Sequence, residues 1–203
     1  EAVILENEAL AYSPDVVVVG YVLNDAEDPS SAERRRAAEW AEEEAAKAHP
    51  PLWRSSAFLS LMAGRLRATR ENRKRIQNHR SLYAPGVPGF AAATQAFGRM
   101  AAICRDRGSP MVVLIFPLFA NPLDASYPFR DVHQQVAGAA RGAGAGVVDA
   151  LPFFEGLDWR LLVVEGAQDE HPNELAHRIA AQALTSALEQ TFGPSHPPSS
   201  PLK

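Results

Sequence analysis

The stretch PDVVVVGYVLND occupies residues 14–25, and the fold of this chain is read most directly from it. Its apolar, β-branched run at 16–20 is typical of a strand buried on both faces, as in a parallel sheet. Two polar residues, Asn24 and Asp25, follow at the carboxyl end of this strand. Because ligands of open α/β sheets bind outside the carboxyl ends of strands, both residues are candidates for a functional site.

Helical and strand patterns alternate along the rest of the chain and predict an α/β fold with a parallel sheet. The apolar runs MVVLIF and VVD predict two further strands, and the last helix is expected to pack through an apolar stripe. The strands are expected at 111–116 and 147–149, the helices at 1–11, 31–48, 54–80, 90–107, 130–141 and beyond Asn173, and the stripe comprises Leu175, Ile179, Leu184, Leu188 and Phe192.

The composition is that of an ordinary globular protein, with 203 residues, 46% hydrophobic residues and a net charge of −4. This length is enough for one α/β domain with a substantial core. No apolar run is long enough for a transmembrane segment, and the negative charge argues against nucleic acid as the main partner. The one cysteine, Cys104, lies on an apolar helix stripe, so a buried and inert thiol is expected. The compartment cannot be read from the sequence.

A second polar stretch, DEHPN at 169–173, precedes the last helix. Pro172 and Asn173 both suit a helix start, proline because it lacks an N–H group and asparagine as an N-cap. His171 is therefore expected on a rigid connection, either as a general base that points into a cleft or as an exposed loop histidine. The histidines show no metal-ligand spacing, and the chain has no glycine-rich phosphate loop, so we expect neither a metal nor a cofactor.

Taken together and in this order, PDVVVVGYVLND and DEHPNELAHRIA resemble the third and last sequence blocks of the SGNH/GDSL hydrolase superfamily. The resemblance extends to about residue 190 and implies a three-layer α/β/α flavodoxin-like fold. It implies that His171 is the general base, that Asp169 orients the imidazole, and that the Asn24 amide donates to the oxyanion.

Other residues of these blocks receive supporting roles from the same resemblance. Gly20 would let the strand end turn, and Asp25 would bond N–H groups of that turn. Many members place the acid three residues before the histidine, a position that Gln168 holds here. Asp169 is nevertheless the preferred acid, and Asp149 is the weaker alternative.

The sequence departs from the superfamily at the nucleophile. It contains no Gly-Asp-Ser motif and no serine in a nucleophile elbow. The chain is expected to begin in the helix before the family's third strand, so that the first two strands would come from an amino-terminal segment or a second chain. Without them the strand at 16–20 would be an uncovered apolar edge. The serines Ser13, Ser55, Ser56, Ser60 and Ser109 are interpreted as cap or turn residues.

The resemblance implies a serine ester hydrolase that acts through an acyl-enzyme on a small ester or on an acylated carbohydrate or lipid. Two alternatives remain open. An O-acyltransferase of the same fold would use an acceptor alcohol in place of water, and a serine-less binding domain would keep the fold without catalysis. A Gly-Asp-Ser motif upstream of this sequence would support the two catalytic hypotheses, and its absence would support the binding domain.

A helical insertion at 26–88 is expected within a domain that spans 1–192, and the Pro/Ser-rich tail at 193–203 is expected to be disordered. The insertion is expected to fold over the cleft as a cap. Its basic run at 65–80, with seven Lys or Arg and one Glu, is by default a solvated face and alternatively a docking patch for an anionic partner. Several aromatic residues are expected either to line the site or to belong to the core. They are Trp40, Trp53, Phe58 and Tyr83 in the insertion, and Phe119, Tyr127 and Phe129 in the loop at 118–129.

Overall fold

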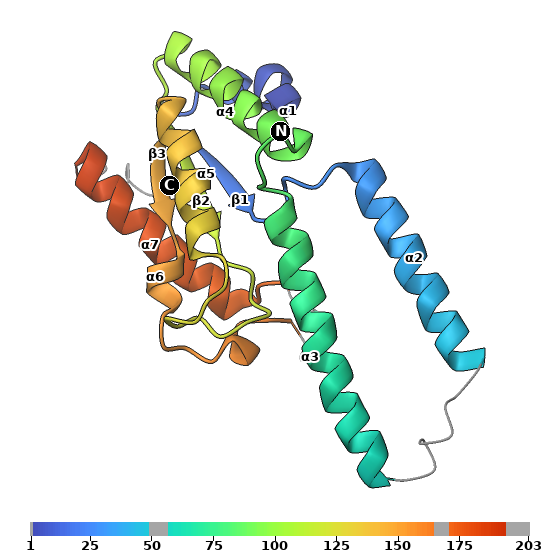
Figure 1. The fold of residues 1–203 in the computed structure, drawn as a ribbon. Helices are drawn as coiled ribbons and strands as arrows, with labels where there is room; N and C mark the ends of the chain where they lie inside the picture. Colours follow the sequence, from blue (N-terminus) through green and yellow to red (C-terminus); the bar gives the residue numbers. More distant parts are fainter. Residues whose placement is uncertain (1, 49–56, 165–170, 194–203) are drawn as a thin grey trace, which may run out of the picture. The chain divides into compact units, whose positions relative to one another are not determined.

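Three parallel strands form one sheet in the order β1-β2-β3, with β1 at Val17–Val22, β2 at Met111–Phe116 and β3 at Gly146–Asp149 (Figure 1). The computed structural model from which this arrangement comes describes residues 2–48, 57–164 and 171–193. Within the sheet Val22 lies opposite Phe116, and Ile115 lies opposite Asp149, so the three carboxyl ends are aligned. The α/β class and the parallel sheet that the apolar runs predict are confirmed.

Helices connect and flank the strands in the order that the sequence patterns predict. The short elements α6 and η3 were outside those predictions, because an apolar periodicity needs more residues than either contains. The helical elements are α1 (Ala2–Asn7), η1 (Ala9–Tyr12), α2 (Pro29–Ala48), α3 (Ala57–Ser81), α4 (Pro88–Asp106), α5 (Arg130–Gly142), α6 (Leu151–Phe154), η3 (Trp159–Leu161) and α7 (Glu174–Phe192). The predicted tail at 194–203 lies outside the described residues.

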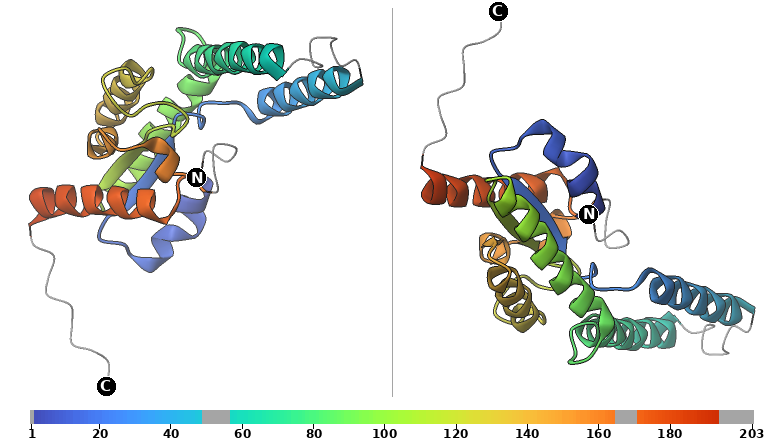
Figure 2. Two further views of the ribbon diagram at one scale, coloured as in Figure 1. Left: turned by 90° about the horizontal axis from the view of Figure 1, so that it is seen from below. Right: turned by 90° about the horizontal axis from the view of Figure 1, so that it is seen from above.

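The central strand β2 is buried on both faces, as its uninterrupted apolar run predicts. The helix α5 packs on β2 and β3, and α7 lies across β3 on the opposite face of the sheet (Figure 2). This gives the three layers of an α/β/α arrangement. The thiol of Cys104 on α4 is buried as predicted, and burial raises its pKa.

The edge strand β1 differs from the prediction, because only one of its faces is buried. Val19 and Tyr21 point into the core, and the ring of Tyr21 lies 5.5 Å from that of Phe97 on α4. Val18 and Gly20, on the other face, are exposed. The reason is positional: α7 covers β3, so among the described helices none shields this face of β1.

The helix α7 packs through alanines and not through the predicted stripe of large side chains. Ala176, Ala180 and Ala183 are buried and recur at intervals of four and three residues, which places them on one face. Leu175 is 46% exposed. The predicted stripe is wrong because its members wind around the helix, and at about 100° per residue Leu175 and Leu184 lie on opposite sides.

The chain divides into two compact units. Residues 1–23 and 94–203 make up the first unit, which contains the sheet, and residues 24–93 make up the second unit. The second unit therefore comprises α2, α3 and the first turns of α4. Its limits lie close to those of the insertion expected at 26–88, whose role as a cap stays a prediction.

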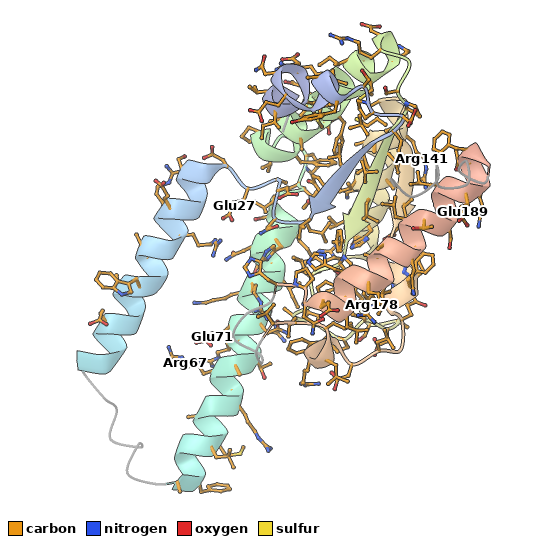
Figure 3. All side chains as sticks on the ribbon, turned by 180° about the vertical axis from the view of Figure 1, so that it is seen from behind. Glu27, Arg67, Glu71, Arg141, Arg178 and Glu189 are labelled. Carbon is orange, nitrogen blue, oxygen red and sulfur yellow. The ribbon has the colours of Figure 1, made fainter. Side chains whose placement is uncertain are left out.

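The second unit has an ion pair within its amino-terminal end and a close backbone approach between its two ends. The carboxylate of Glu27 accepts two hydrogen bonds from the guanidinium of Arg35, at 2.9 and 3.0 Å; Glu27 is labelled in Figure 3. The carbonyl oxygen of the buried Ala26 approaches Gly89 so closely that a Cβ atom on Gly89 would overlap it. Residues from both ends of the insertion are thus held together at one place.

Candidate active site

The candidate oxyanion donor Asn24 lies in the turn that follows β1. The turn is closed by a hydrogen bond of 2.9 Å from the N–H of Glu27 to the carbonyl oxygen of Asn24. Both Asn24 and its neighbour Asp25 are exposed. Within the described part of the chain the side-chain amide of Asn24 makes no hydrogen bond, so both of its N–H groups are available as donors.

Gly20 does not have the role expected of it at the end of the strand. It lies inside β1, opposite Leu114, and pairing with β2 continues to Val22. Its backbone is not in the left-handed region, and a Cβ atom there would meet nothing within 4 Å. The turn begins after Val22, so the backbone freedom of glycine is not needed at position 20.

The candidate base His171 lies just before α7 on a backbone that is anchored on both sides. Its carbonyl oxygen accepts a hydrogen bond of 3.0 Å from the N–H of Val164, and the N–H of Asn173 donates to the carbonyl oxygen of Leu162 at 2.9 Å. An antiparallel bridge pairs Val163 with Pro172 between these two bonds. The backbone of His171 is therefore fixed, while the residue itself is exposed.

Asn173 is the N-cap of α7, as predicted, and it does more than cap the helix. Its Oδ1 accepts from the N–H of Ala176 at 3.1 Å. Its Nδ2 donates to the carbonyl oxygens of Leu161 and Val163, at 2.9 and 3.2 Å. The side chain thus ties the first turn of α7 to the segment that pairs with the backbone of His171.

The start of α7 lies beside the carboxyl end of the sheet. The ring of His177 on α7 lies 6.0 Å from the ring of Phe116, the last residue of β2. A shallow surface pocket of about 320 Å³ adjoins the same turn and is lined by Asn173, Glu174, Leu175 and Arg178. Arg178 is labelled in Figure 3. A second pocket of the same volume lies at the opposite end of β2, beside Met111.

The preferred acid, Asp169, lies outside the described residues, and its alternative, Asp149, is engaged elsewhere. Oδ1 of Asp149, at the end of β3, lies 2.8 Å from Nδ1 of His133 and accepts from the N–H of Leu151 at 3.0 Å. Burial of the Asp149 carboxyl opposes its ionisation, but the hydrogen bond and charge of His133 outweigh it and hold the pKa below its usual value. Asp149 therefore already orients a different histidine.

His133 is a buried polar residue in this region that was not predicted as a site residue. Its side chain is 1% exposed, and its Nε2 has no hydrogen-bond partner in the described structure. The ring of Tyr127 meets it edge-on at 5.7 Å, and the Tyr127 hydroxyl accepts from the N–H of Leu118 at 2.8 Å. Burial raises the pKa of Tyr127. The sequence did indicate that His133 is buried, since it lies next to Val132 on the apolar face of its helix.

The serines that the structure describes in detail have the local roles that were predicted. Ser13 ends η1 in the left-handed conformation, with φ of 50°, and lies before β1. Ser109 is buried and donates to the carbonyl oxygen of Pro14 at 2.6 Å, at the amino end of β2. Neither position is near the carboxyl ends of the strands. Ser55 and Ser56 lie outside the described residues.

The aromatic residues of the loop at 118–129 belong to the core and do not form a wall of a site. Phe119, Tyr127 and Phe129 are all buried, and Phe119 meets Phe154 edge-on at 5.0 Å. In the second unit Tyr83 is buried against Phe90, with ring centroids 4.9 Å apart. Trp40 and Phe58 are exposed, so the core interpretation fails for both. Trp53 lies outside the described residues.

Among residues 2–48, 57–164 and 171–193, no group of three or more His, Cys, Asp or Glu side chains is arranged to hold a metal ion. The helices described there include none that is long and apolar enough to cross a bilayer. Comparisons of the chain with protein-family models, curated proteins and solved structures found no match. Residue roles in this protein therefore have to be argued from its own geometry and chemistry.

Proposed function

We propose that this chain carries the general base and the oxyanion donor of a serine ester hydrolase that acts through an acyl-enzyme. The observation that carries the proposal is the anchored backbone on both sides of His171. It fixes the position from which an exposed imidazole is presented at the start of α7. A general base needs this combination of defined geometry and access to the reacting proton.

In this proposal His171 removes the proton from a serine hydroxyl as the serine oxygen attacks the ester carbonyl. The imidazolium then gives that proton to the leaving alcohol, and an acyl-enzyme remains. Water, deprotonated by the same imidazole, attacks the acyl carbonyl, which releases the acid and restores the serine. Asp169 accepts a hydrogen bond from the other ring nitrogen and stabilises the imidazolium.

Asn24 is assigned to the negatively charged oxygen of the tetrahedral intermediate. Support comes from its place directly after β1 and from side-chain N–H groups that have no partner in the described residues. A donor of this kind contributes about 3–4 kcal/mol to transition-state stabilisation in comparable sites. A small ester or an acylated carbohydrate or lipid is the proposed substrate class.

The nucleophilic serine is assigned to polypeptide outside these 203 residues. Ser13 and Ser109 are occupied by local roles before the strands, and no serine follows a strand end directly. The edge position of β1, which pairs with β2 alone in the described sheet, supports the further proposal that a neighbouring segment pairs beside this strand. That segment would bring the serine and complete the sheet.

Activity-based labelling tests the proposal in the full-length protein. A fluorophosphonate probe, followed by peptide mass spectrometry, is expected to label one serine, and that serine is expected to lie outside these 203 residues. Hydrolysis of short-chain nitrophenyl esters should accompany the labelling, whereas the 203-residue chain alone should hydrolyse none. If the full-length protein is neither labelled nor active on esters, the proposal fails and a binding domain becomes the better reading. Faster acyl transfer to an added alcohol than to water would identify a transferase.

A further inference from the structure

A second feature of the molecule lies entirely on α3 and is independent of the proposed hydrolase site. The first turns of this helix expose four large apolar side chains: Phe58 is 69%, Leu61 56%, Met62 43% and Leu66 60% exposed. Isolated exposed apolar residues are normal, but four within nine positions of one helix form a patch. At 1.5 Å per residue this patch is about 12 Å long.

The apolar patch runs directly into a cationic segment on the same helix. Met62, Leu66, Arg70 and Lys74 follow one another at intervals of four residues and thus form one row along the helix surface. The row changes from apolar to cationic halfway along. Phe58 lies one turn before Met62 in this row. Arg73 lies in the neighbouring row that begins at Leu61, so the same side of α3 carries both chemistries.

Most cations of this segment have no acidic partner. Within the described residues Arg65, Arg70, Arg73 and Lys74 form no ion pair. Arg67, in contrast, bonds Glu71 one turn away at 2.6 Å; Figure 3 labels both residues. This concentration of unpaired positive charge occurs in a chain whose net charge is −4.

We propose that this side of α3, from Phe58 to Lys74, docks on the surface of an anionic phospholipid bilayer. A bilayer surface offers acyl chains for the apolar patch and phosphate groups for the cations, in the adjacent order that the helix presents. Interfacial helices lie in the plane of the membrane surface and bury their apolar side chains about 5–10 Å into the headgroup boundary. The patch is too short to span a bilayer.

Other occupants satisfy only half of this surface. A nucleic acid would meet the cations but leave Phe58, Leu61 and Met62 in water. A second copy of the chain would cover the apolar patch while bringing like charges together. Of these three occupants, the membrane surface complements both parts.

Flotation of the purified chain with vesicles tests the proposal. Binding is expected to vesicles of phosphatidylcholine with one-quarter phosphatidylglycerol, to weaken as salt is raised, and to be much weaker with phosphatidylcholine alone. The triple variant Arg70→Gln, Arg73→Gln, Lys74→Gln should lose affinity on the order of 100-fold, because each cation contributes roughly fivefold. The matched control Arg105→Gln, Arg107→Gln, Arg141→Gln makes the same change in net charge on exposed positions elsewhere and should bind normally. Arg141 is labelled in Figure 3.

A second pair of variants tests the apolar half. Phe58→Ser with Leu66→Ser should reduce vesicle binding at least tenfold and leave the circular dichroism spectrum unchanged, because both side chains are exposed. Phe192→Ser, at another exposed phenylalanine, serves as the control. Equal loss of binding in both charge triples would overturn the proposal. So would dimers in sedimentation that disappear with Phe58→Ser and Leu66→Ser, or binding to nucleic acid that is tighter than binding to anionic vesicles.

Discussion

Nδ1 of His133 lies 2.8 Å from Oδ1 of Asp149, and this contact joins the buried face of α5 to the carboxyl end of β3. The carboxylate also accepts from the N–H of Leu151, the first residue of α6. Asp149 bonds two elements, whereas the ring nitrogens of His133 have no other hydrogen-bond partner in the described residues. Loss of the carboxylate should therefore affect mainly the histidine.

Asp149→Ala is therefore expected to destabilise the protein by about 1 kcal/mol for the lost hydrogen bond to Leu151 and by about 1–3 kcal/mol more for the buried N–H left unpaired. Asp158→Ala is the matched control, because Asp158 also accepts from a backbone N–H at the start of a short helix, that of Arg160 at 3.0 Å, but has no buried partner. Urea unfolding measures both variants. Equal losses in the two would contradict a special role for the His133 contact.

The stability conferred by Asp149 should depend on pH in a defined direction. Its pKa in the folded protein lies below the ordinary value of 3.8, so the folded state holds this proton less tightly than the unfolded state. The contribution is therefore complete above that value and is lost as the pH falls through the folded pKa. The stability difference between the wild type and Asp149→Asn should be constant near neutrality and shrink in urea titrations below pH 3.8. A difference that grows in acid would reverse the assigned sign.

Asn173 allows a test that separates capping from anchoring. At most N-caps aspartate and asparagine are equivalent. Here Asn173→Asp keeps the acceptor for Ala176 but sets a carboxylate oxygen against the carbonyl oxygens of Leu161 and Val163. This variant should lower the free energy of unfolding by about 1–3 kcal/mol, nearly as much as Asn173→Ala. Thermal or urea unfolding measures both variants. Wild-type stability in Asn173→Asp would mean that the two Nδ2 bonds contribute nothing.

Two glycines of α4 should respond in opposite ways to the same substitution. Gly89→Ala places a Cβ atom onto the carbonyl oxygen of Ala26 and should cost at least about 1–3 kcal/mol through backbone displacement. Gly98→Ala meets nothing within 4 Å and should stabilise the helix by about 0.5–1 kcal/mol. Calorimetry of the two variants checks the difference in sign. A Gly89→Ala variant as stable as the wild type would show that the backbone at Ala26 and Gly89 moves apart at little cost in free energy.

The proposed chemistry predicts distinct kinetic losses in the full-length protein. His171→Ala should lower kcat by about 10⁴-fold or more with little change in unfolding temperature, because the residue is exposed. Asn24→Ala should lower kcat by about 10²–10³-fold and leave KM closer to normal. His177→Ala, the control at an exposed histidine within α7, should keep its activity. Near-normal ester turnover in His171→Ala would reject the assignment of the base.

Sequence patterns predicted the elements of this fold better than the contacts between them. The run at 111–116 reads as a strand buried on both faces because both faces are indeed covered. The similar run in β1 reads the same way, yet Val18 is exposed. An apolar side chain can be buried, but its sequence does not say whether it is. Burial depends on whether a helix from a distant part of the chain covers it.

Small and polar residues account for the other differences. The alanines of α7 carry its packing, but a search for large apolar side chains passes over them. His133 and Asp149 are sixteen residues apart, and their partnership arises only when α5 packs against the sheet. The start of α7 was predictable because Asn173 acts locally, through a side-chain oxygen that accepts from the N–H of Ala176. Pro172 lies just before this N-cap and outside the first turn.

The meeting of Ala26 with Gly89 has a consequence for how this chain tolerates change. The insertion at 26–88 begins and ends at this one contact. Its length is therefore independent of the strands β1 and β2 that precede and follow it. Turns could be added to or removed from α2 and α3 without altering the register of β1 with β2. The insertion could in this sense be replaced as a unit, and the residues on the surface of its helices could change without affecting the sheet.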